Sequence, residues 1–412
     1  MRCDILVLGA GMIGTCTALQ LARRGRAVVL LDRSAPGSET SHGNAGLIQR
    51  EAVEPSPFPR NWKALLRAAL GLGVDVHYHS SALPALLPRL WRYWAASAPS
   101  HHEAIAAQYS RLIEHCLAEH EVLIAECGAE ALVRRTGYRH VYRTDAALAA
   151  AAVRAENLMR RFGVRFTLQG PAELAQAEPA LRPGLAGAVH WLDTWCVRDP
   201  GELVRRYAAR FEALGGQTRQ GDAASLQRKG AAWQVQTSFG PVTAAHAIVA
   251  LGAWSEPVLR CLGYRLPLFV KRGYHQHFAG GAGLRLPLLD AERGYVLAPM
   301  ARGLRLTTGA EFARLGAPAT PVQLVKATQA ARELLDLREA LAEPPWLGNR
   351  PCTVDMKPVV GPAPRDPGLW FNFGHAHQGF TLGPVSARLL ADMVDGAIPY
   401  IDPAPYAPGR FL

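Results

Sequence analysis

The chain begins with the hydrophobic pattern of an α/β unit. Residues Ile5–Leu8 are consecutively apolar, which is typical of a strand buried on both faces. The apolar periodicity of Met12–Arg24 predicts a helix that ends at Gly25. A second apolar run, Ala27–Leu31, follows directly. Two such runs around one helix predict the first strands of a parallel sheet.

A different pattern occupies residues 57–100, where Leu and Trp recur among Lys and Arg. Six of these apolar residues have the spacing of one helix face, namely Leu83, Leu86, Leu87, Leu90, Trp91 and Trp94. An apolar face opposite basic residues is typical of a helix lying on a membrane surface. A face packed on its own domain gives the same pattern. Both interpretations stay open, and the total charge slightly favours the membrane.

The later part of the chain predicts a second, mixed sheet and further strands of the first, parallel sheet. Asp199 and Pro200 have the pattern of a helix start, and a small-residue turn at 251–255 follows another buried strand. Residues 264–312 predict strands of a mixed sheet, and Pro321–Leu341 predicts a helix. A strand at Leu369–Phe373 and a last helix complete the chain.

Three glycines after the first strand indicate a dinucleotide site. Gly9, Gly11 and Gly14 have the spacing G-x-G-x-x-G, which permits a tight turn, close approach to a pyrophosphate, and close helix–strand packing. Asp32 ends the second apolar run, where an acid accepts hydrogen bonds from the adenosine ribose. A Gly-rich turn of an unrelated α/β protein would leave Asp32 as a coincidence.

The loop 33–46 after Asp32 is polar and rich in small residues. We expect its backbone N–H groups to approach the ligand, and the hydroxyls of Thr40 and Ser41 to bind phosphate. An ordinary surface loop is the alternative.

A second anion site is predicted near the end of the chain. The turn Gly379–Gly383 opens the last helix, and a helix N-terminus offers free N–H groups and a dipole of about half a charge. Such a site suits a ligand group that carries negative charge. His375 precedes the turn, where it either bonds a ligand or only lines the turn.

Charge, cysteines and hydropathy exclude several classes. The net charge is +11, yet no long basic block interleaves with aromatic residues, so we expect no nucleic-acid partner. The seven cysteines include no C-x-x-C pair, which argues against a disulfide framework, a zinc ribbon or an iron–sulfur cluster. His275, His277 and the His101-His102 pair lack further metal-ligand residues nearby, so no metal is expected. The first strand leaves no room for a cleavable signal peptide, and the longest apolar runs are too short to span a bilayer. We therefore expect a cytoplasmic protein. Peripheral attachment to the inner face of the cell membrane is left open.

Six motifs in order resemble the FAD-dependent amine and amino-acid oxidoreductases of the D-amino-acid oxidase and glycine oxidase type. They are Gly9–Gly14, Thr40-Ser41 with Asn44-Ala45-Gly46, Leu251–Ser255, Lys271–Tyr274, Trp346–Gly361 and Gly374–Thr381. The resemblance runs nearly end to end. It implies an α/β fold with a discontinuous, Rossmann-like FAD-binding domain and an inserted mixed-sheet α+β substrate domain. We expect the FAD-binding domain at 1–56, 165–262 and 342–412, and the substrate domain at 57–164 and 263–341.

The resemblance also implies the residues of the site. Those expected to bind FAD are Gly9, Gly11, Gly14, Asp32, Arg33, Thr40, Ser41, Asn44, Ala45, Gly46, Gly252, Trp254, Gly379, Phe380 and Thr381. Arg350 matches the carboxylate-binding arginine, whose planar fork fixes both carboxylate oxygens; pairing with Asp355 is the alternative. Tyr274 and Tyr295 are candidates to bond the same carboxylate or the amine, or are half-buried sheet residues. His375 completes the catalytic candidates. Cys352 does not match the spacing of covalent flavin attachment, so FAD is expected to be non-covalent.

The resemblance implies oxidation of D-amino acids to 2-oxo acids and ammonia, with hydride transfer from Cα to flavin N5 and a quinone as acceptor. The alternatives are a D-hydroxyproline dehydrogenase, an opine oxidase subunit within a hetero-oligomer, or a glycine or sarcosine oxidase. A flavin-dependent nucleic-acid-binding protein is a distant alternative.

Overall fold

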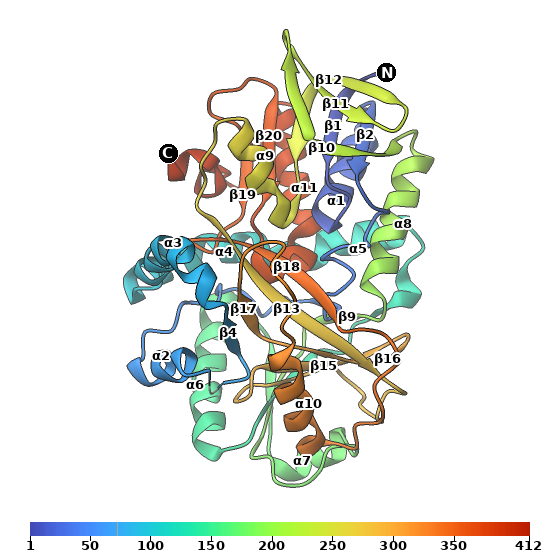
Figure 1. Ribbon diagram of the computed structural model, residues 1–412. Coiled ribbons are helices and arrows are strands. Elements are labelled where there is room, and N and C mark those ends of the chain that lie inside the picture. Colours follow the sequence, from blue (N-terminus) through green and yellow to red (C-terminus); the bar gives the residue numbers. More distant parts are fainter. Residues whose placement is uncertain (72) are drawn as a thin grey trace.

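A mainly parallel sheet forms the upper half of the computed structural model, which describes residues 1–71 and 73–412 (Figure 1). Its parallel strands lie in the order β10–β2–β1–β12–β20, with β19 antiparallel at the edge. Strands β10, β11 and β12 continue beyond it as an antiparallel meander. The strands are β1 (Arg2–Leu8), β2 (Val28–Asp32), β10 (Gln217–Lys229), β11 (Ala232–Thr237), β12 (Gly240–Val249), β19 (Val359–Pro362) and β20 (Leu369–Phe373).

Both faces of this sheet are buried, as its continuous apolar strands predict. Ile5 and Val7 pack into one core with helices α1 (Met12–Arg23), α8 (Pro200–Ala213) and α11 (Gly379–Val394). Leu6 and Leu8 pack into a second core with helix α9 (Ser255–Cys261). The alternation of side chains along a strand sends successive residues to opposite faces, so a strand covered on both faces has to be apolar throughout.

The lower half is built on a ten-stranded mixed sheet (Figure 1). Its main path runs β4–β17–β13–β16–β15–β14–β6–β8–β7, and β18 pairs with β13. The strands are β4 (Val76–Tyr78), β6 (Tyr138–Tyr142), β7 (Phe166–Gln169), β8 (Gly187–Trp191), β13 (Leu268–Phe278), β14 (Leu288–Asp290), β15 (Tyr295–Met300), β16 (Gly303–Thr307), β17 (Ala310–Phe312) and β18 (Trp346–Thr353).

Helix α10 (Val322–Leu334) packs on this sheet and is shorter than expected. The predicted helix Pro321–Leu341 was wrong in its second half. Leu335 adopts an extended conformation with φ −153°, is fully buried, and bridges to Leu181. Burial against a segment distant in sequence therefore ends the helix where the local pattern predicts that it continues.

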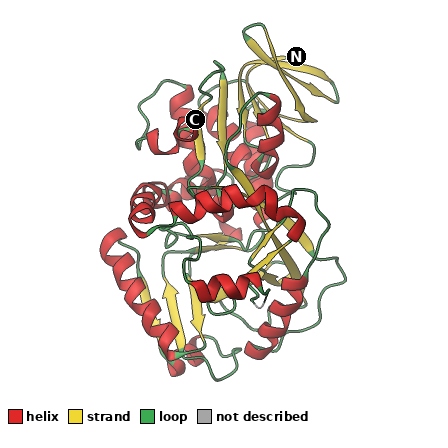
Figure 2. Ribbon diagram, turned by 60° about the vertical axis from the view of Figure 1, so that its left-hand side comes forward, coloured by secondary structure: helices red, strands yellow, loops and turns green. Residues whose placement is uncertain are grey.

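The remaining helices lie on the outside of the strands (Figure 2). They are α2 (Trp62–Ala69), α3 (Leu83–Ala96), α4 (Pro99–Glu114), α5 (Cys116–Glu126), α6 (Asp145–Phe162) and α7 (Pro171–Ala177). A small antiparallel sheet joins β3 (Leu47–Ile48), β9 (Trp195–Val197) and β5 (Val133–Arg134). The predicted cap of α8 is confirmed, because the Asp199 side chain accepts the N–H of Glu202.

The apolar face predicted for 83–94 is divided between core and surface. Leu86, Leu90 and Tyr93 pack inward, whereas Leu87 and Trp91 are 59% and 67% exposed. The packing interpretation is confirmed for the buried part of the face, and the membrane interpretation stays a prediction for the exposed part. Residue 72 of the predicted segment 57–100 lies outside the described residues. Across residues 1–71 and 73–412, the structure contains no helix both long and apolar enough to cross a bilayer.

Strand pairing differs from the expected domain boundaries at two places. Strands β7 and β8 fall within the expected segment 165–262, yet both belong to the ten-stranded sheet. Strand β18 falls within 342–412 and pairs with β13. The division into two domains stays a prediction, and we propose that its boundaries follow the sheets, near residues 199 and 354. A strand joins the sheet in which its distant partner lies, which the local pattern does not specify.

Candidate functional site

One long cavity of about 1290 Å³ connects the two halves of the protein. It exceeds the volume of roughly 300–1,000 Å³ that is usual for small-molecule pockets. Twelve of the predicted cofactor residues line it, namely Gly9, Gly11, Asp32, Arg33, Thr40, Ser41, Asn44, Ala45, Gly252, Trp254, Gly379 and Phe380. Arg350 and His375 line it as well. The structure thus brings together residues from six segments of the sequence.

The glycine turn at one end of the cavity has the geometry of a dinucleotide site. Gly9 has φ +106°, and a Cβ there would lie 2.5 Å from the carbonyl oxygen of Ala250. Gly11 is the N-cap of α1, and a Cβ on it would meet only Ser41 Oγ, at 3.4 Å. The space beside Gly11 is therefore open to the cavity at a helix N-terminus, as a bound pyrophosphate requires.

Asp32 and Arg33 line the part of the cavity next to the glycine turn. The Ala10 N–H donates to Oδ2 of Asp32 (2.6 Å), and the Ser34 N–H donates to Oδ1 (3.0 Å). Each carboxylate oxygen retains a second acceptor position, which suits ribose hydroxyls. The Arg33 guanidinium lies 4.5 Å from the centre of the Trp254 ring. These contacts fix the end of the cavity where the sequence predicts the adenosine.

A second helix N-terminus faces the same cavity. Helix α11 begins at Gly379 without a side-chain cap, and Gly379 lines the cavity. Gly383, one turn later, permits close contact with α1, because a Cβ there would lie 2.5 Å from Met12 Cγ. The two anion sites predicted from the sequence are therefore held by helices that pack on each other.

Three predicted cofactor residues do not line the cavity and have packing roles. A Cβ on Gly14 would lie 1.7 Å from the Gly9 carbonyl oxygen, and one on Gly46 would lie 2.1 Å from that of Val197. Thr381 is buried, and its hydroxyl accepts the N–H of Gln49 (3.1 Å). Gly14 and Gly46 permit close packing of the segments around the cavity, and Thr381 joins two of these segments by a hydrogen bond.

Arg350 lies in the cavity as a cation without an acidic partner. Its guanidinium donates to the carbonyl oxygens of Gly309 (2.7 Å) and Thr308 (3.2 Å), and it forms no ion pair with any acid of the described residues. Asp355, the alternative partner, pairs with Arg410 instead (2.8 Å). Gly273 provides the space, because a Cβ there would lie 2.3 Å from Arg350 Nη2. Burial lowers the pKa of Arg350, and an anionic ligand would relieve this cost.

Of the two predicted tyrosines, Tyr274 lines the cavity and Tyr295 does not. The Tyr274 hydroxyl donates to Glu311 (2.9 Å) and accepts the N–H of Thr320 (2.8 Å), on the face of β13 opposite Gly273. Tyr295 is buried among the residues that pack under α10 and does not line the cavity. Both hydrogen bonds of the Tyr274 hydroxyl are therefore with protein groups, and the contact of either tyrosine with the substrate stays a prediction.

His375 and His377 differ in their positions at the cavity. His375 is buried, and its Nε2 bonds Ser386 Oγ (3.0 Å), while Nδ1 has no partner among the described residues. Burial lowers its pKa to about 3. Removal from bulk solvent and the positive charges of Arg350 and Lys271 lower the pKa of His377 to about 3 as well. Both imidazoles are therefore neutral at physiological pH.

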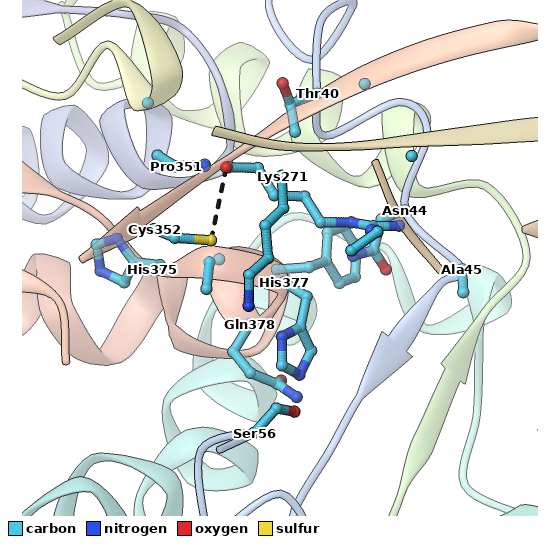
Figure 3. A pocket seen from close by; sticks show the side chains of 18 of the residues that line it. Thr40, Asn44, Ala45, Ser56, Lys271, Pro351, Cys352, His375, His377 and Gln378 are labelled. Carbon is cyan, nitrogen blue, oxygen red and sulfur yellow. Dashed lines mark hydrogen bonds between the residues drawn. The ribbon is translucent and has the colours of Figure 1, made fainter. Parts of the chain in front are cut away.

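Lys271 is the functional candidate that the sequence reasoning missed. Its side chain extends toward His377 and Gln378 (Figure 3), and it donates to the Tyr93 hydroxyl (2.9 Å). The signal was present in the alternation of β13, because Lys271 lies two residues from Gly273 and shares its face.

A group of potential metal ligands lies where β4 pairs with β17. The ligand atoms of His77, His79 and Glu311 lie within 4.8 Å of one another. The buried Arg272 guanidinium already pairs with Glu311 (2.5 Å) and supplies positive charge at this position.

Comparison with known proteins agrees with this geometry. A family model described as "DAO: FAD dependent oxidoreductase" matches residues 4–393. The chain is a member of this family. It is 33% identical to a D-amino acid dehydrogenase of Paramagnetospirillum magneticum over 95% of both chains. It is 29% identical to a D-amino-acid oxidase of Bradyrhizobium diazoefficiens over 99% of both. The crystal structure of a glycine oxidase from Geobacillus kaustophilus matches with a TM-score of 0.76 at 22% identity, covering 100% of this chain and 99% of that one.

This member of the DAO family is an FAD-dependent oxidoreductase with a mixed α/β fold. The open space beside Gly11 and the two helix N-termini fit FAD, so the family membership and the geometry agree on the cofactor. The resemblance stated from six sequence motifs is confirmed.

The neutral histidines lead to a prediction about pH. We expect kcat/KM to rise with pH along one limb set by the pKa of the substrate's own amine, because His375 and His377 titrate only near pH 3. The measurement is the pH profile of kcat/KM for two substrates whose amines differ in pKa. The pH at which kcat/KM rises should differ between the two substrates, as the pKa values of their amines do. A limb near pH 6.5 that is common to both substrates and disappears in His377→Asn would contradict this assignment.

Proposed function

We propose that the protein oxidises D-amino acids at Cα to imino acids, which hydrolyse to 2-oxo acids and ammonia. Bound FAD supplies the chemistry by accepting a hydride at N5. The observation that carries the proposal is Arg350, a guanidinium without an acidic partner in the FAD cavity. The names of the relatives, D-amino acid dehydrogenase and D-amino-acid oxidase, support the same substrate class.

Arg350 would bind both oxygens of the substrate carboxylate and so fix the direction of the Cα–H bond. The carbonyl oxygens of Gly309 and Thr308 hold the guanidinium in place. No general base is required, because a substrate with a neutral amine loses only the hydride and becomes a protonated imine, which water hydrolyses to the 2-oxo acid and ammonium. The neutral His375 and His377 are consistent with this scheme.

We further infer that FAD is bound non-covalently. Cys352 lines the cavity, but burial raises the pKa of its thiol, which disfavours the thiolate that covalent attachment needs. Acid precipitation should release the flavin into the supernatant, and flavin retained by the precipitate would contradict the inference.

The experiment that tests the reaction is anaerobic. The purified yellow protein is mixed with D- and L-amino acids, D-proline derivatives, sarcosine and opines, and flavin bleaching is recorded. We expect the D-amino acids to bleach it. Bleaching by N-substituted substrates alone would contradict the proposal and favour the alternatives, a D-hydroxyproline dehydrogenase, an opine oxidase subunit or a sarcosine oxidase.

We propose a quinone in the cell membrane as the electron acceptor, because an apolar surface of α2 and α3 faces solvent. This 62–91 surface consists of Trp62, Leu66, Leu70, Leu87 and Trp91, which are 50–67% exposed. The Arg60 guanidinium lies 3.8 Å from the centre of the Trp94 ring, so the start of α2 lies beside the end of α3. Asp75 is the single acid between residues 57 and 102, against five basic residues. Exposed Trp and Leu among basic side chains suit an anionic bilayer.

The double variant Trp62→Ser/Trp91→Ser should weaken binding to phosphatidylglycerol vesicles by about 10- to 100-fold. The measurement is co-sedimentation with vesicles, and phosphatidylcholine vesicles should bind less of either protein. Phe239→Ser is the matched control, because Phe239 is an aromatic residue that is 85% exposed on the distant β11–β12 turn. Unchanged vesicle binding, or a change in oligomeric state instead, would contradict the membrane assignment.

A further inference from the structure

Two neighbouring cations, not one, face the substrate end of the cavity. Lys271 on β13 and Arg350 on β18 are direct cross-strand partners, and both line the cavity. Neither forms an ion pair with an acid within residues 1–71 and 73–412. Like charges directly opposite each other in a sheet are destabilising, so this pair has a cost that the protein alone does not compensate.

The Arg350 guanidinium and the Lys271 ammonium extend in opposite directions along β13. The Arg350 guanidinium lies over Gly273. The Lys271 ammonium lies 5.7 Å from the centre of the Phe269 ring and 4.3 Å from that of Tyr93. Residues 269 and 273 lie on the same strand on opposite sides of residue 271, with their Cα atoms roughly 13 Å apart at about 3.3 Å per residue. A single carboxylate bound by the Arg350 guanidinium is therefore not expected to bind the Lys271 ammonium as well.

Lys271 is held in place without being neutralised. Its ammonium donates to the Tyr93 hydroxyl (2.9 Å), and that hydroxyl donates to the carbonyl oxygen of Ser56 (2.6 Å). The rings of Tyr93, Phe269 and Phe312 surround the ammonium at 4.3–5.8 Å. Aromatic faces stabilise a cation only partly, and an ammonium has three donors. Its positive charge remains available to a ligand in the cavity.

We propose that Lys271 binds a second carboxylate of the substrate, so that the preferred substrates are amino acids with two acidic groups. This inference rests on the proposed function, in which Arg350 binds the α-carboxylate. The second carboxylate belongs either to the side chain, as in D-glutamate, or to a substituent on nitrogen, as in iminodiacetate. Lys271 acts in substrate recognition and takes no part in hydride transfer.

The test compares substrates of equal shape and different charge. The ratio of kcat/KM for D-glutamate to that for D-glutamine is measured in the native holoenzyme, in Lys271→Met and in Lys271→Arg. We expect the native ratio to be well above one. Lys271→Met should lower the ratio by about tenfold to a hundredfold, because a charge-assisted hydrogen bond is lost, and Lys271→Arg should restore much of it. Iminodiacetate against sarcosine gives the same comparison for a carboxylate on nitrogen.

The outcomes separate this inference from the function on which it rests. Bleaching of the flavin by D-glutamine and D-glutamate at equal efficiency, with a ratio that Lys271→Met does not change, would overturn the inference and leave the proposed function standing. A fall in kcat/KM by the same factor for both substrates would also overturn it, because Lys271 would then act at the α-carboxylate. If no amino acid bleaches the flavin, the proposed function itself fails.

Discussion

Replacing Arg350 by Met should lower kcat/KM for every amino-acid substrate by about 30- to 1,000-fold, which corresponds to roughly 2–4 kcal/mol of lost binding in the transition state. The native guanidinium has no acidic partner among the described residues and bonds only two carbonyl oxygens on its own chain. Its loss therefore leaves the substrate carboxylate without a counter-charge in a partly enclosed cavity. The measurement is steady-state kinetics with the flavin content of each preparation determined.

Two further variants separate charge from geometry at this position. Arg350→Lys keeps a positive charge but lacks the planar fork, so it should retain part of the activity that Arg350→Met loses. Gly273→Ala leaves Arg350 in place, but the new Cβ would lie 2.3 Å from Nη2 and displace the guanidinium. It should raise KM although no charge is lost. A KM for Arg350→Met equal to that of the native protein would remove Arg350 from the substrate site.

The second large effect concerns the glycine turn, where two substitutions should have different consequences. Gly11→Ala should lower the affinity for FAD by about 100-fold or more with the fold intact, because its Cβ would meet only Ser41 Oγ, at 3.4 Å, and occupy the space that a pyrophosphate needs. Gly14→Ala should destabilise the apoprotein itself by about 1–3 kcal/mol or more, because its Cβ would lie 1.7 Å from the Gly9 carbonyl oxygen.

The measurements are the melting temperature of each apoprotein and the dissociation constant of FAD. Gly409→Ala is a suitable control, because nothing lies within 4 Å of a Cβ at that position. If Gly11→Ala binds FAD as the native protein does, the turn does not hold the pyrophosphate. If both variants melt like the control, the packing role of Gly14 is wrong.

The sequence predicted the parts of the site that depend on local pattern. The apolar run Ile5–Leu8, the glycine spacing and the position of Asp32 are set within a single strand–turn–helix unit, and the structure confirms that unit. The second helix start at Gly379 was also local, because a Gly-rich turn before an apolar helix is visible in the residues themselves.

The sequence did not show which face of a strand a side chain occupies. Tyr274 was chosen for its hydroxyl, yet that hydroxyl bonds Glu311, although Tyr274 lines the cavity together with Lys271 and Gly273. A shift of one residue in register exchanges the two faces. Tyr295 does not line the cavity, whereas its neighbour Val296 does.

Long-range pairing explains the remaining differences. The segments 166–169 and 187–191 are short strands without a preferred partner in their own sequence, and their membership of the ten-stranded sheet depends on β6. The division of the 83–94 face between core and solvent depends in the same way on what packs against it.

The most direct test of the account is anaerobic flavin reduction by a D-amino acid and by its amide. The two compounds share the amine and the Cα–H bond, and they differ in the carboxylate that Arg350 is proposed to hold. The account predicts that D-alanine bleaches the bound FAD at least about 30-fold faster than D-alaninamide at equal subsaturating concentration, and that Arg350→Met abolishes most of this difference. Equal bleaching by the acid and the amide would contradict it.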